Sequence, residues 1–583
     1  MDSSVSTTYR THPVHVFPWL RVDEGHHALV ASLNQMVSEA PDAGLIVIDG
    51  FVGLPWDTFI SSLQAAFEHD MQLVCWHSTE GCFRTAPEIH ALLETTLTMD
   101  PVFGRIFHGT LEELWVPEKV AKLQEVLAKR EDGSLTILYG FGASLISSAG
   151  IRVYVDVPKD QGQKLAAQGI ICNVGAAEPE SFGEMYKRFY FVDWPMLNRV
   201  KRAMLPHMHL FIDGTESESP RFVHGDAFRR ALHQLARQPF RVKPWFAPGP
   251  WGGQWMKERF GLPPEQPNYA WSFELIAPEN GILLGDGKRS LECSFDYLLW
   301  AETDAVVGVP VAARFGSYFP LRFDYLDTMS GTNLSCQVHP RVDYIRNEFG
   351  EPLTQDETYY IVTNKPGAQV FLGLREDIDI KSFREDAVKA RDKGIAFDIT
   401  KHVHRESSKP HDLFLIPSGT VHCSGADNLV LEISATPYIY TFKIYDYLRK
   451  DLSDNLRHVH LEHAFANIDN LRTTKWVQSH LCPHPVLLRS GAGWEEYVIG
   501  DIDLLFFSIH RLEFTDQISD QTNGKFHALN LVEGERCEII TEGNAPIELH
   551  FAESIIIPAS VEQYQLHNRG QGKCKVVKAF VKA

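Results

Sequence analysis

Two polar residues stand two positions apart in the stretch Asn333–Pro340 (NLSCQVHP), which has the character of a β-strand. Alternate side chains of a strand point to one face, so Gln337 and His339 can reach the same point. Glu357, in the apolar run DETYYIV, and His422, in the run FLIPSGTVHCSG, supply two further donors. Nitrogen and oxygen donors of these types suit Zn²⁺ or another divalent first-row ion. Together the four residues predict a metal site.

The elements that must position these residues fall into three segments. Residues 1–242 alternate short apolar strands, such as LIVIDG, with helical runs, which predicts an α/β layer with a mostly parallel sheet. Residues 243–471 turn strand-rich with short turns, which is typical of an all-β domain. We therefore expect a multidomain chain, in which the second segment carries the metal site.

The third segment, residues 472–583, contains an echo of the second. The run ESIIIPASVEQYQL has the same order of residue types as HDLFLIPSGTVHCSG, but Gln563 stands where the earlier copy has His422. The echo predicts a second β-barrel of the same kind that lacks metal ligands.

One helical insert interrupts the strands of the second segment, at about 376–394. Its apolar residues Ile380, Phe383, Ala387 and Ala390 recur at helical spacing. Two interpretations remain open at this point, a cap beside the metal site and a surface helix with no role.

Composition excludes several classes of function. The net charge of −20 has no concentrated basic run beside it, which argues against nucleic-acid binding. No apolar run is long enough to span a bilayer, and the first residues lack a signal-peptide pattern, so we expect a cytoplasmic protein that does not bind membranes. The nine cysteines are scattered without any CxxC spacing, which excludes a Cys-rich zinc module.

The first strand, loop and helix of the chain sit where a P-loop kinase holds its phosphates. Aligning Gly50 with the first glycine of GxxxxGK[ST] puts Trp56 and Asp57 at the last two positions, so the Lys is missing. In layout the segment resembles a uridine-kinase-like P-loop domain that has lost its phosphate loop. We expect a helper domain without catalysis.

A series of motifs in one order covers the second segment. They are WGG, WSFE, LSCQVHP, DETYYIV, VFLGLRED, IPSGTVHCSG, LVLEIS and FKIYDYLR, between Trp251 and Arg449. This order resembles the class I mannose-6-phosphate isomerase family, and more closely its shorter bacterial members. The resemblance implies a cupin fold, one Zn²⁺ per chain, and interconversion of mannose 6-phosphate and fructose 6-phosphate.

The resemblance also assigns roles to single residues. The family's metal ligands match the four residues named above, and Ser335 matches a serine near the substrate phosphate. Glu432, in LVLEIS, matches a position proposed for proton transfer. Two positions depart from the family: Gln355 replaces a common Lys, and Lys443 replaces an Arg taken as an active-site residue. These departures bear on the identity of the sugar, because Lys keeps the charge but not the bidentate fork of Arg.

The chemistry of aldose–ketose isomerisation sets the same requirements without reference to a family. A base such as Glu432 must move a proton between adjacent carbons, and a divalent ion can hold negative charge on oxygen. Cations must hold the phosphate, and Lys443, Arg449 and Lys365 are candidates.

Three functions compete on these grounds. The first is a metal-dependent isomerase of mannose 6-phosphate, with a small-molecule hexose phosphate as its partner, or an isomerase of a different sugar phosphate. The second is a non-catalytic sugar-phosphate-binding cupin protein, because of the substitutions at Gln355 and Lys443. The third is another metal-dependent cupin enzyme such as an oxygenase, which is disfavoured because such sites commonly use His-rich triads.

Overall fold

The computed structural model describes residues 9–40, 44–70, 72–129, 135–437, 439–450 and 455–582. By their contacts the residues divide into two units, each built from separate stretches of chain. Unit 1 comprises Met1–His12, Ala236–Ala277 and Thr303–Ala583, and unit 2 comprises Pro13–Leu235 and Pro278–Glu302. Among the described residues, no helix has the length and apolar character needed to cross a membrane.

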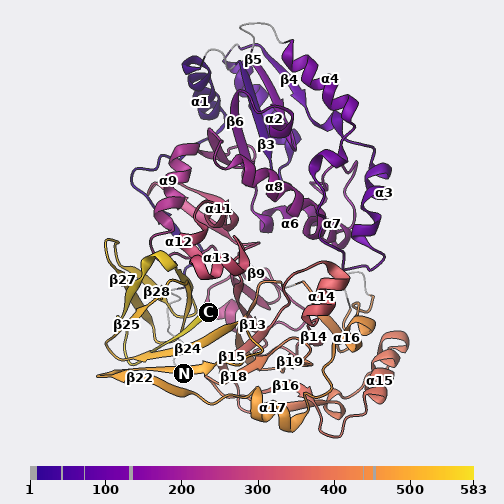
Figure 1. The fold of residues 1–583 in the computed structure, drawn as a ribbon, viewed down its shortest axis with the longest axis vertical. Helices are drawn as coiled ribbons and strands as arrows, with labels where there is room; N and C mark the ends of the chain where they lie inside the picture. The colour runs from indigo at the N-terminus through magenta and orange to yellow at the C-terminus, as the bar shows by residue number, and fades with distance from the viewer. Residues whose placement is uncertain are drawn as a thin grey trace. The chain divides into compact units, whose positions relative to one another are not determined.

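Unit 2 is built on a seven-stranded sheet in the order β2-β8-β7-β6-β3-β5-β4. Its parallel pairs join β4 (Val74–Ser78), β5 (Leu135–Tyr139), β3 (Leu45–Gly50), β6 (Ile151–Asp156) and β7 (Leu210–Asp213). Strands β8 (Arg221–His224) and β2 (Asp23–Glu24) continue the sheet antiparallel. The helices α1 (His26–Glu39) and α2 (Trp56–His69) pack their apolar residues against it in one core. These elements are drawn in indigo to magenta in Figure 1.

A second, distant stretch of chain completes unit 2. Strands β11 (Gly281–Gly285) and β12 (Ser290–Ser294) form a small sheet with β1 (Val14–Val16), and α11 (Phe295–Ala301) follows. The expected boundary at residue 242 therefore differs from the observed division, because residues 278–302 pack with the N-terminal unit. Residue spacing does not indicate that residues 278–302 pack with unit 2, because their strand pattern is the same as that of the all-β segment around them.

Acidic residues at the carboxyl ends of the unit 2 strands are held by the protein's own groups. Asp49 accepts backbone hydrogen bonds from Gly142 (2.9 Å) and Ser144 (3.1 Å). Asp156 pairs with Lys201 (2.7 Å), and the backbone N–H of Ser294 donates to it (3.2 Å). The crevice beyond these strand ends is where ligands of open α/β sheets bind. In this unit the segment 290–296 contributes to filling it.

Unit 1 begins with an antiparallel barrel made of two sheets. The larger has the order β18-β15-β20-β13-β10-β9, and the smaller has the order β17-β16-β19-β14-β21. The larger sheet comprises β9 (Trp245–Ala247), β10 (Trp271–Leu275), β13 (Leu321–Asp327), β15 (Glu357–Asn364), β18 (Leu413–Ile416) and β20 (Asn428–Ala435). The smaller comprises β14 (Cys336–Val338), β16 (Gln369–Leu374), β17 (Val403–Ser407), β19 (His422–Ser424) and β21 (Phe442–Tyr445).

The predicted helical insert is confirmed as α15 (Ile380–Lys393). The Asp379 side chain caps its N-terminus by accepting from the backbone of Lys381 and Ser382, and Gly394 ends it in the left-handed conformation. The predicted apolar residues Phe383, Ala387 and Ala390 are buried.

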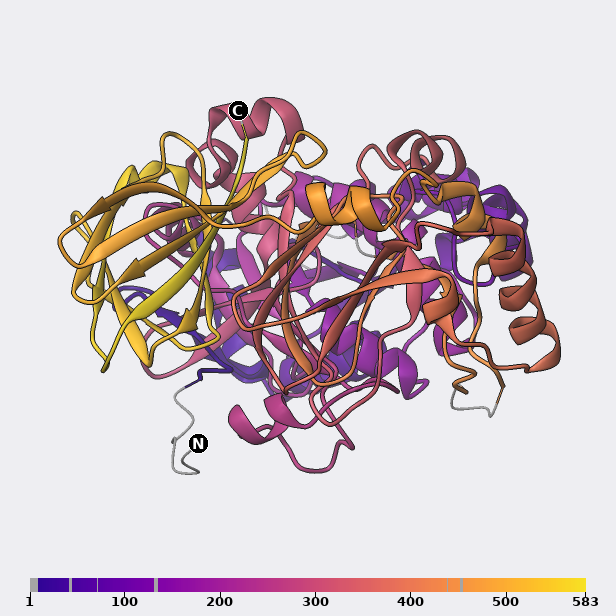
Figure 2. The same cartoon turned by 90° about the horizontal axis from the view of Figure 1, so that it is seen from below.

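The C-terminal strands form a second pair of antiparallel sheets, coloured orange to yellow in Figure 2. One sheet comprises β22 (Val486–Gly491), β23 (Trp494–Gly500), β24 (Phe507–Phe514), β26 (His527–Glu533), β29 (Ser554–Ile557) and β31 (Cys574–Val581). The other comprises β25 (Gln517–Gln521), β27 (Arg536–Thr541), β28 (Ile547–His550) and β30 (Gln563–Asn568). An apolar cluster that includes Leu512, Ile518, Leu531 and Val576 lies between them.

Candidate metal centre and active site

The four predicted ligands meet in the first barrel of unit 1. Gln337 lies on β14 directly opposite His422 on the neighbouring strand β19, and Glu357 opens β15 in the facing sheet. His339 Nε2 is 2.9 Å from Glu357 Oε2, and His422 Nε2 is 2.8 Å from Glu357 Oε1. The Gln337 amide lies 3.3 Å from His422 Nε2. The strands β14, β15 and β19 thus direct four donor groups to one buried point, and His339 is the residue directly after β14.

The residues present fit a metal ion. His339 Nε2 and Glu357 Oε1 are buried atoms without a hydrogen-bond partner, although both lie within 3 Å of an oppositely polar atom. Polar atoms that lie this close together but lack hydrogen-bond geometry have the arrangement of ligand atoms around a cation. Gln337 is the most exposed of the four, at 8%, while the other three are fully buried.

Backbone carbonyls orient both imidazoles. His339 Nδ1 lies 3.1 Å from the carbonyl oxygen of Tyr440, and His422 Nδ1 lies 2.8 Å from that of Thr420. Such contacts place the proton on Nδ1 and leave Nε2 as the ligand atom. Burial raises the pKa of Glu357, but the two imidazoles outweigh it and hold the pKa below its usual value. The carboxylate therefore stays charged.

Glu432 lies beside this cluster, on the same face of the sheet as Glu357. On β20 it stands opposite Tyr359 of β15, so it is the diagonal neighbour of Glu357. Arg322, on β13, forms an ion pair with Glu432 and also lies 3.4 Å from Asp324. Burial and the Glu357 charge raise the pKa of Glu432, against the opposing effect of Arg322.

Sequence reasoning missed Arg322. The signal was present, because Arg322 and Asp324 are charged residues that alternate with apolar ones in the run LRFDYL. Only the strand pairing shows that this alternation faces Glu432.

Lys443 also faces the cluster. It stands opposite Gln337 on β21, the strand on the other side of β14 from His422. Burial lowers the pKa of Lys443 to about 8, and the nearby Arg457 adds to this effect. The ammonium group therefore remains mostly protonated at neutral pH while it can still release its proton.

The remaining predicted residues divide by position. The Ser335 hydroxyl donates to Gln337 Oε1 (3.1 Å), so it is within the cluster. Arg449 is held by Asp446 (2.9 Å), by the Thr332 hydroxyl (2.8 Å) and by the carbonyl of Asn333, next to the strand that carries Gln337.

Lys365 is not brought to the cluster. It follows the far end of β15, and the eight residues from Glu357 to Asn364 span roughly 25 Å of extended chain. Its ammonium pairs with Asp427 (2.9 Å) and the Ser330 hydroxyl (2.7 Å). The expectation that Lys365 binds substrate at this site is corrected. Lys365 is close in sequence to the strand that carries Glu357, but it follows the opposite end of that strand.

Gln355, which the family resemblance compares with a common Lys, contacts the cluster directly. Its amide donates to Glu357 Oε2 (2.8 Å). The substitution exchanges a cation for a neutral donor that orients the central carboxylate.

Comparison with known proteins gives separate results for different parts of the chain. Residues 25–237 match a family model described as a domain of unknown function, DUF8485. The probable mannose-6-phosphate isomerase GmuF of Bacillus subtilis (strain 168) is 30% identical over 237 residues, which are 40% of this chain and 68% of GmuF. The chain belongs to the mannose-6-phosphate isomerase family.

Other members of the isomerase family match over a longer stretch at lower identity. The mannose-6-phosphate isomerase ManA of the same organism is 24% identical over 345 residues, which are 59% of this chain and 99% of ManA. A crystal structure of the mannose 6-phosphate isomerase from Bacillus subtilis aligns with 22% identity and a TM-score of 0.46, covering 59% of this chain and 99% of that one. For unit 2, the resemblance to a P-loop kinase remains a prediction.

Proposed function

We propose that this chain is a metal-dependent aldose–ketose isomerase that interconverts mannose 6-phosphate and fructose 6-phosphate through an enediol. The observation that carries the proposal is the buried convergence of Gln337, His339, Glu357 and His422 beside the Glu432–Arg322 pair. The donor types suit one Zn²⁺ per chain. When bound, such an ion supplies a Lewis acid for the oxygens at C1 and C2 of the sugar.

Glu432 is the group we assign to the proton transfer between carbons. Its carboxylate takes the proton from C2 of mannose 6-phosphate and returns it to C1 of the enediol, which leaves the carbonyl at C2. Its raised pKa suits this role, because a base is most effective when its pKa lies near the working pH. Arg322 holds the carboxylate in place from the side opposite Glu357.

Lys443 is the group we assign to the substrate oxygens. Its position opposite Gln337 puts a partly buried ammonium beside the metal ligands. There it can donate a proton to the oxygen at C1, and the amine so formed can take the proton from the hydroxyl at C2, which restores the ammonium group. Ser335 and Arg449 are proposed to contact the phosphate end of the sugar, since both lie on the stretch that leads into β14 or are held against it.

A non-catalytic sugar-phosphate-binding role is the second candidate. Gln355 favours it, because it is a neutral donor to Glu357 at the position where the family resemblance implies a Lys.

A coupled assay for conversion of mannose 6-phosphate to fructose 6-phosphate, with metal content measured on the same sample, separates the two functions. A panel of other hexose phosphates tests the identity of the sugar. We expect turnover that depends on stoichiometric metal. Metal-replete protein without turnover of any hexose phosphate would refute the isomerase proposal and favour the binding role.

A further inference from the structure

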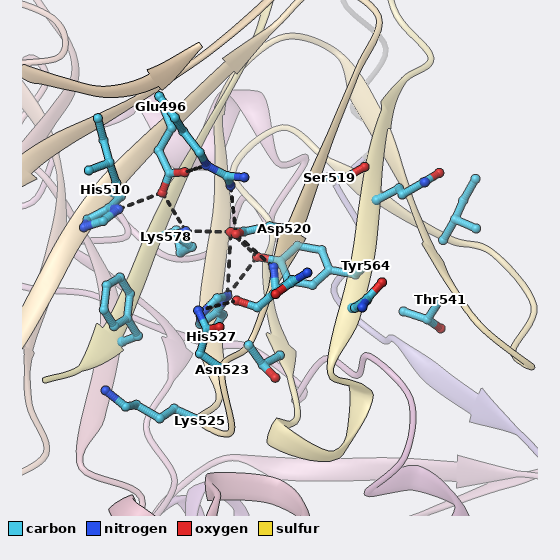
Figure 3. A pocket seen from close by; sticks show the side chains of 18 of the residues that line it. Glu496, His510, Ser519, Asp520, Asn523, Lys525, His527, Thr541, Tyr564 and Lys578 are labelled. Carbon is cyan, nitrogen blue, oxygen red and sulfur yellow. Dashed lines mark hydrogen bonds and ion pairs between the residues drawn. The ribbon is translucent and has the colours of Figure 1, made fainter. Parts of the chain in front are cut away.

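The C-terminal barrel contains a polar cavity that the isomerase site does not use. Its volume is about 690 Å³, which is in the range of small-molecule sites. Strands from both sheets of the barrel and the turn 521–525 line it. Figure 3 shows its side chains, which include Glu496, His510, Asp520, His527, Tyr564 and Lys578.

The cavity arises from a change of residue type along the inward faces of the strands. On β24 the inward side chains are apolar at Leu512 and polar at His510, and on β31 Val576 is followed by Lys578 at the next inward position. The two halves of the barrel share the same strands and the same alternation. The polar half is therefore specified by side chains and not by a break in the fold.

A network of ion pairs and hydrogen bonds fixes the floor of the cavity. Lys578 Nζ lies 2.7 Å from Glu496 Oε1 and 2.6 Å from Asp520 Oδ2. Arg489 pairs with the same two carboxylates, at 2.9 Å from Asp520. The Tyr564 hydroxyl donates to Asp520 (3.1 Å). Figure 3 shows these links as dashed lines.

This network does not serve stability in an obvious way. Well-packed apolar side chains usually stabilise a core as much as a buried ion pair, or more, because charges lose their hydration on burial. The other half of the same barrel is filled in that apolar way. Strongly perturbed buried groups that line a cavity are instead typical of binding sites.

The charges of the floor cancel one another. Two cations, Lys578 and Arg489, face two carboxylates, Glu496 and Asp520. Elsewhere in the lining, Lys525 and Glu542 add one charge of each sign. Burial and Lys578 lower the pKa of His527 to about 3, so that its ring is neutral at physiological pH. An anion would need a net positive floor, and a metal ion would need carboxylate oxygens that are not already held by cations.

Fixed donors and acceptors without net charge suit hydroxyl groups, each of which both donates and accepts. Phe580 and Tyr564 add aromatic faces that suit the C–H groups of a sugar ring. We propose that this cavity binds a neutral carbohydrate, a hexose or one glycosyl unit of a longer chain. The site is separate from the metal centre, and the proposal does not depend on the isomerase activity.

Lys525 allows the sign of the ligand charge to be tested. It lines the cavity, lies apart from the network in Figure 3, and makes no side-chain ion pair within the described part of the chain. A phosphorylated or otherwise anionic ligand would use it, whereas a neutral sugar would not depend on it.

The test uses the full metal-loaded chain and the probes D-mannose, D-glucose, D-galactose, D-fructose and inorganic phosphate. Calorimetry measures affinity, and hydrogen–deuterium exchange of the wild type locates the bound probe. We expect one neutral hexose to bind and to slow exchange in segments 519–527 and 561–566. Tyr564→Phe and Asp520→Asn should each weaken binding about tenfold, because the first removes a hydroxyl group from the floor and the second replaces an acceptor oxygen of Asp520 with a donor.

Matched controls are available on the same sheets. Asp516→Asn, at an exposed position on the approach to β25, and Tyr497→Phe, on β23, should leave the affinity unchanged. Lys525→Met should also leave hexose binding unchanged. The proposal is overturned if no hexose slows exchange in these two segments of the wild type, or if inorganic phosphate binds there and Lys525→Met abolishes that binding.

Discussion

The proton-transfer role proposed for Glu432 can be tested by replacing it with an amide of the same shape. In Glu432→Gln the side chain can still accept a hydrogen bond from Arg322, and Arg322 retains Asp324 at 3.4 Å. Replacing the charged acceptor of this bond with a neutral one costs at most the roughly 1.5–3 kcal/mol that a hydrogen bond to a charged group contributes to folding stability. The fold and the four metal ligands should therefore survive.

Activity should fall far more than stability. General base catalysis contributes about 10²- to 10⁴-fold, so kcat should fall by that factor, which corresponds to roughly 3–5 kcal/mol of barrier. The coupled assay measures kcat, incorporation of solvent deuterium at C2 of the sugar measures proton removal, and metal analysis confirms that the site is loaded.

Asp324→Asn is the matched control for this experiment. Asp324 stands opposite Glu432 and also contacts Arg322, but β13 is one strand farther from Glu357 than β20 is. The control makes the same change of charge beside the same arginine, and its kcat should stay within about threefold of wild type, since no transferred proton passes through it. If Glu432→Gln retained comparable activity while loaded with metal, or if both variants lost activity equally, the assignment of Glu432 as the base would be wrong.

Three further predictions concern other charged groups. Activity should fall as pH rises through about 8, where Lys443 loses its proton, and in Lys443→Arg this alkaline limb should move to higher pH. Removing metal with a chelator should lower the melting temperature, because a ligand whose free concentration is a hundred times its Kd stabilises the folded state by about 2.7 kcal/mol. The pKa of His527 is lowered in the fold, so the unfolded chain takes up the proton first as pH falls below 6.5. The free energy of unfolding of the barrel should then fall by about 1.4 kcal/mol per pH unit towards pH 3, and it should fall by less in His527→Gln.

Each of these has a result that would contradict it. A pH–rate profile of Lys443→Arg identical to wild type would remove Lys443 from the reaction. An unchanged melting temperature after chelation, with metal loss verified, would mean that the Glu357 cluster does not bind the ion. Denaturant titrations in which wild type and His527→Gln lose stability equally with acid would show that the imidazole is not held neutral.

Residue types and two-residue spacing predict one part of the proposed metal cluster. Gln337 and His339 share a strand face, and strand periodicity alone places them together. Glu357 and His422 were added from their donor types in strand-like runs and from the family resemblance, and the structure places them at the first residues of β15 and β19. Residues at strand starts are well specified by their turns, which are local features of sequence.

What could not be predicted depends on pairing between distant strands. The Arg322–Glu432 pair joins strands separated by about a hundred residues, and nothing local specifies which strands are neighbours. The floor of the C-terminal cavity could not be predicted for the same reason. Glu496, Asp520 and Lys578 lie on three different strands, and each one taken alone has the sequence context of a surface charge. Lys365 was assigned to the site wrongly, because it lies at the end of β15 opposite to the end that carries Glu357.

The return of residues 278–302 to unit 2 has a consequence for genetics. The chain passes between the two units after residues 12, 235, 277 and 302, so no single cut separates them. A gene truncated after codon 242 would encode β1 without its partner β11, and would leave Asp156 without the backbone donor at Ser294. The fragment 25–237 that matches the family model lacks this donor as well, so the buried carboxylate of Asp156 would lose one of its hydrogen bonds there. Point substitutions in the whole chain therefore test the role of this region more cleanly than deletion, which also removes these contacts within unit 2.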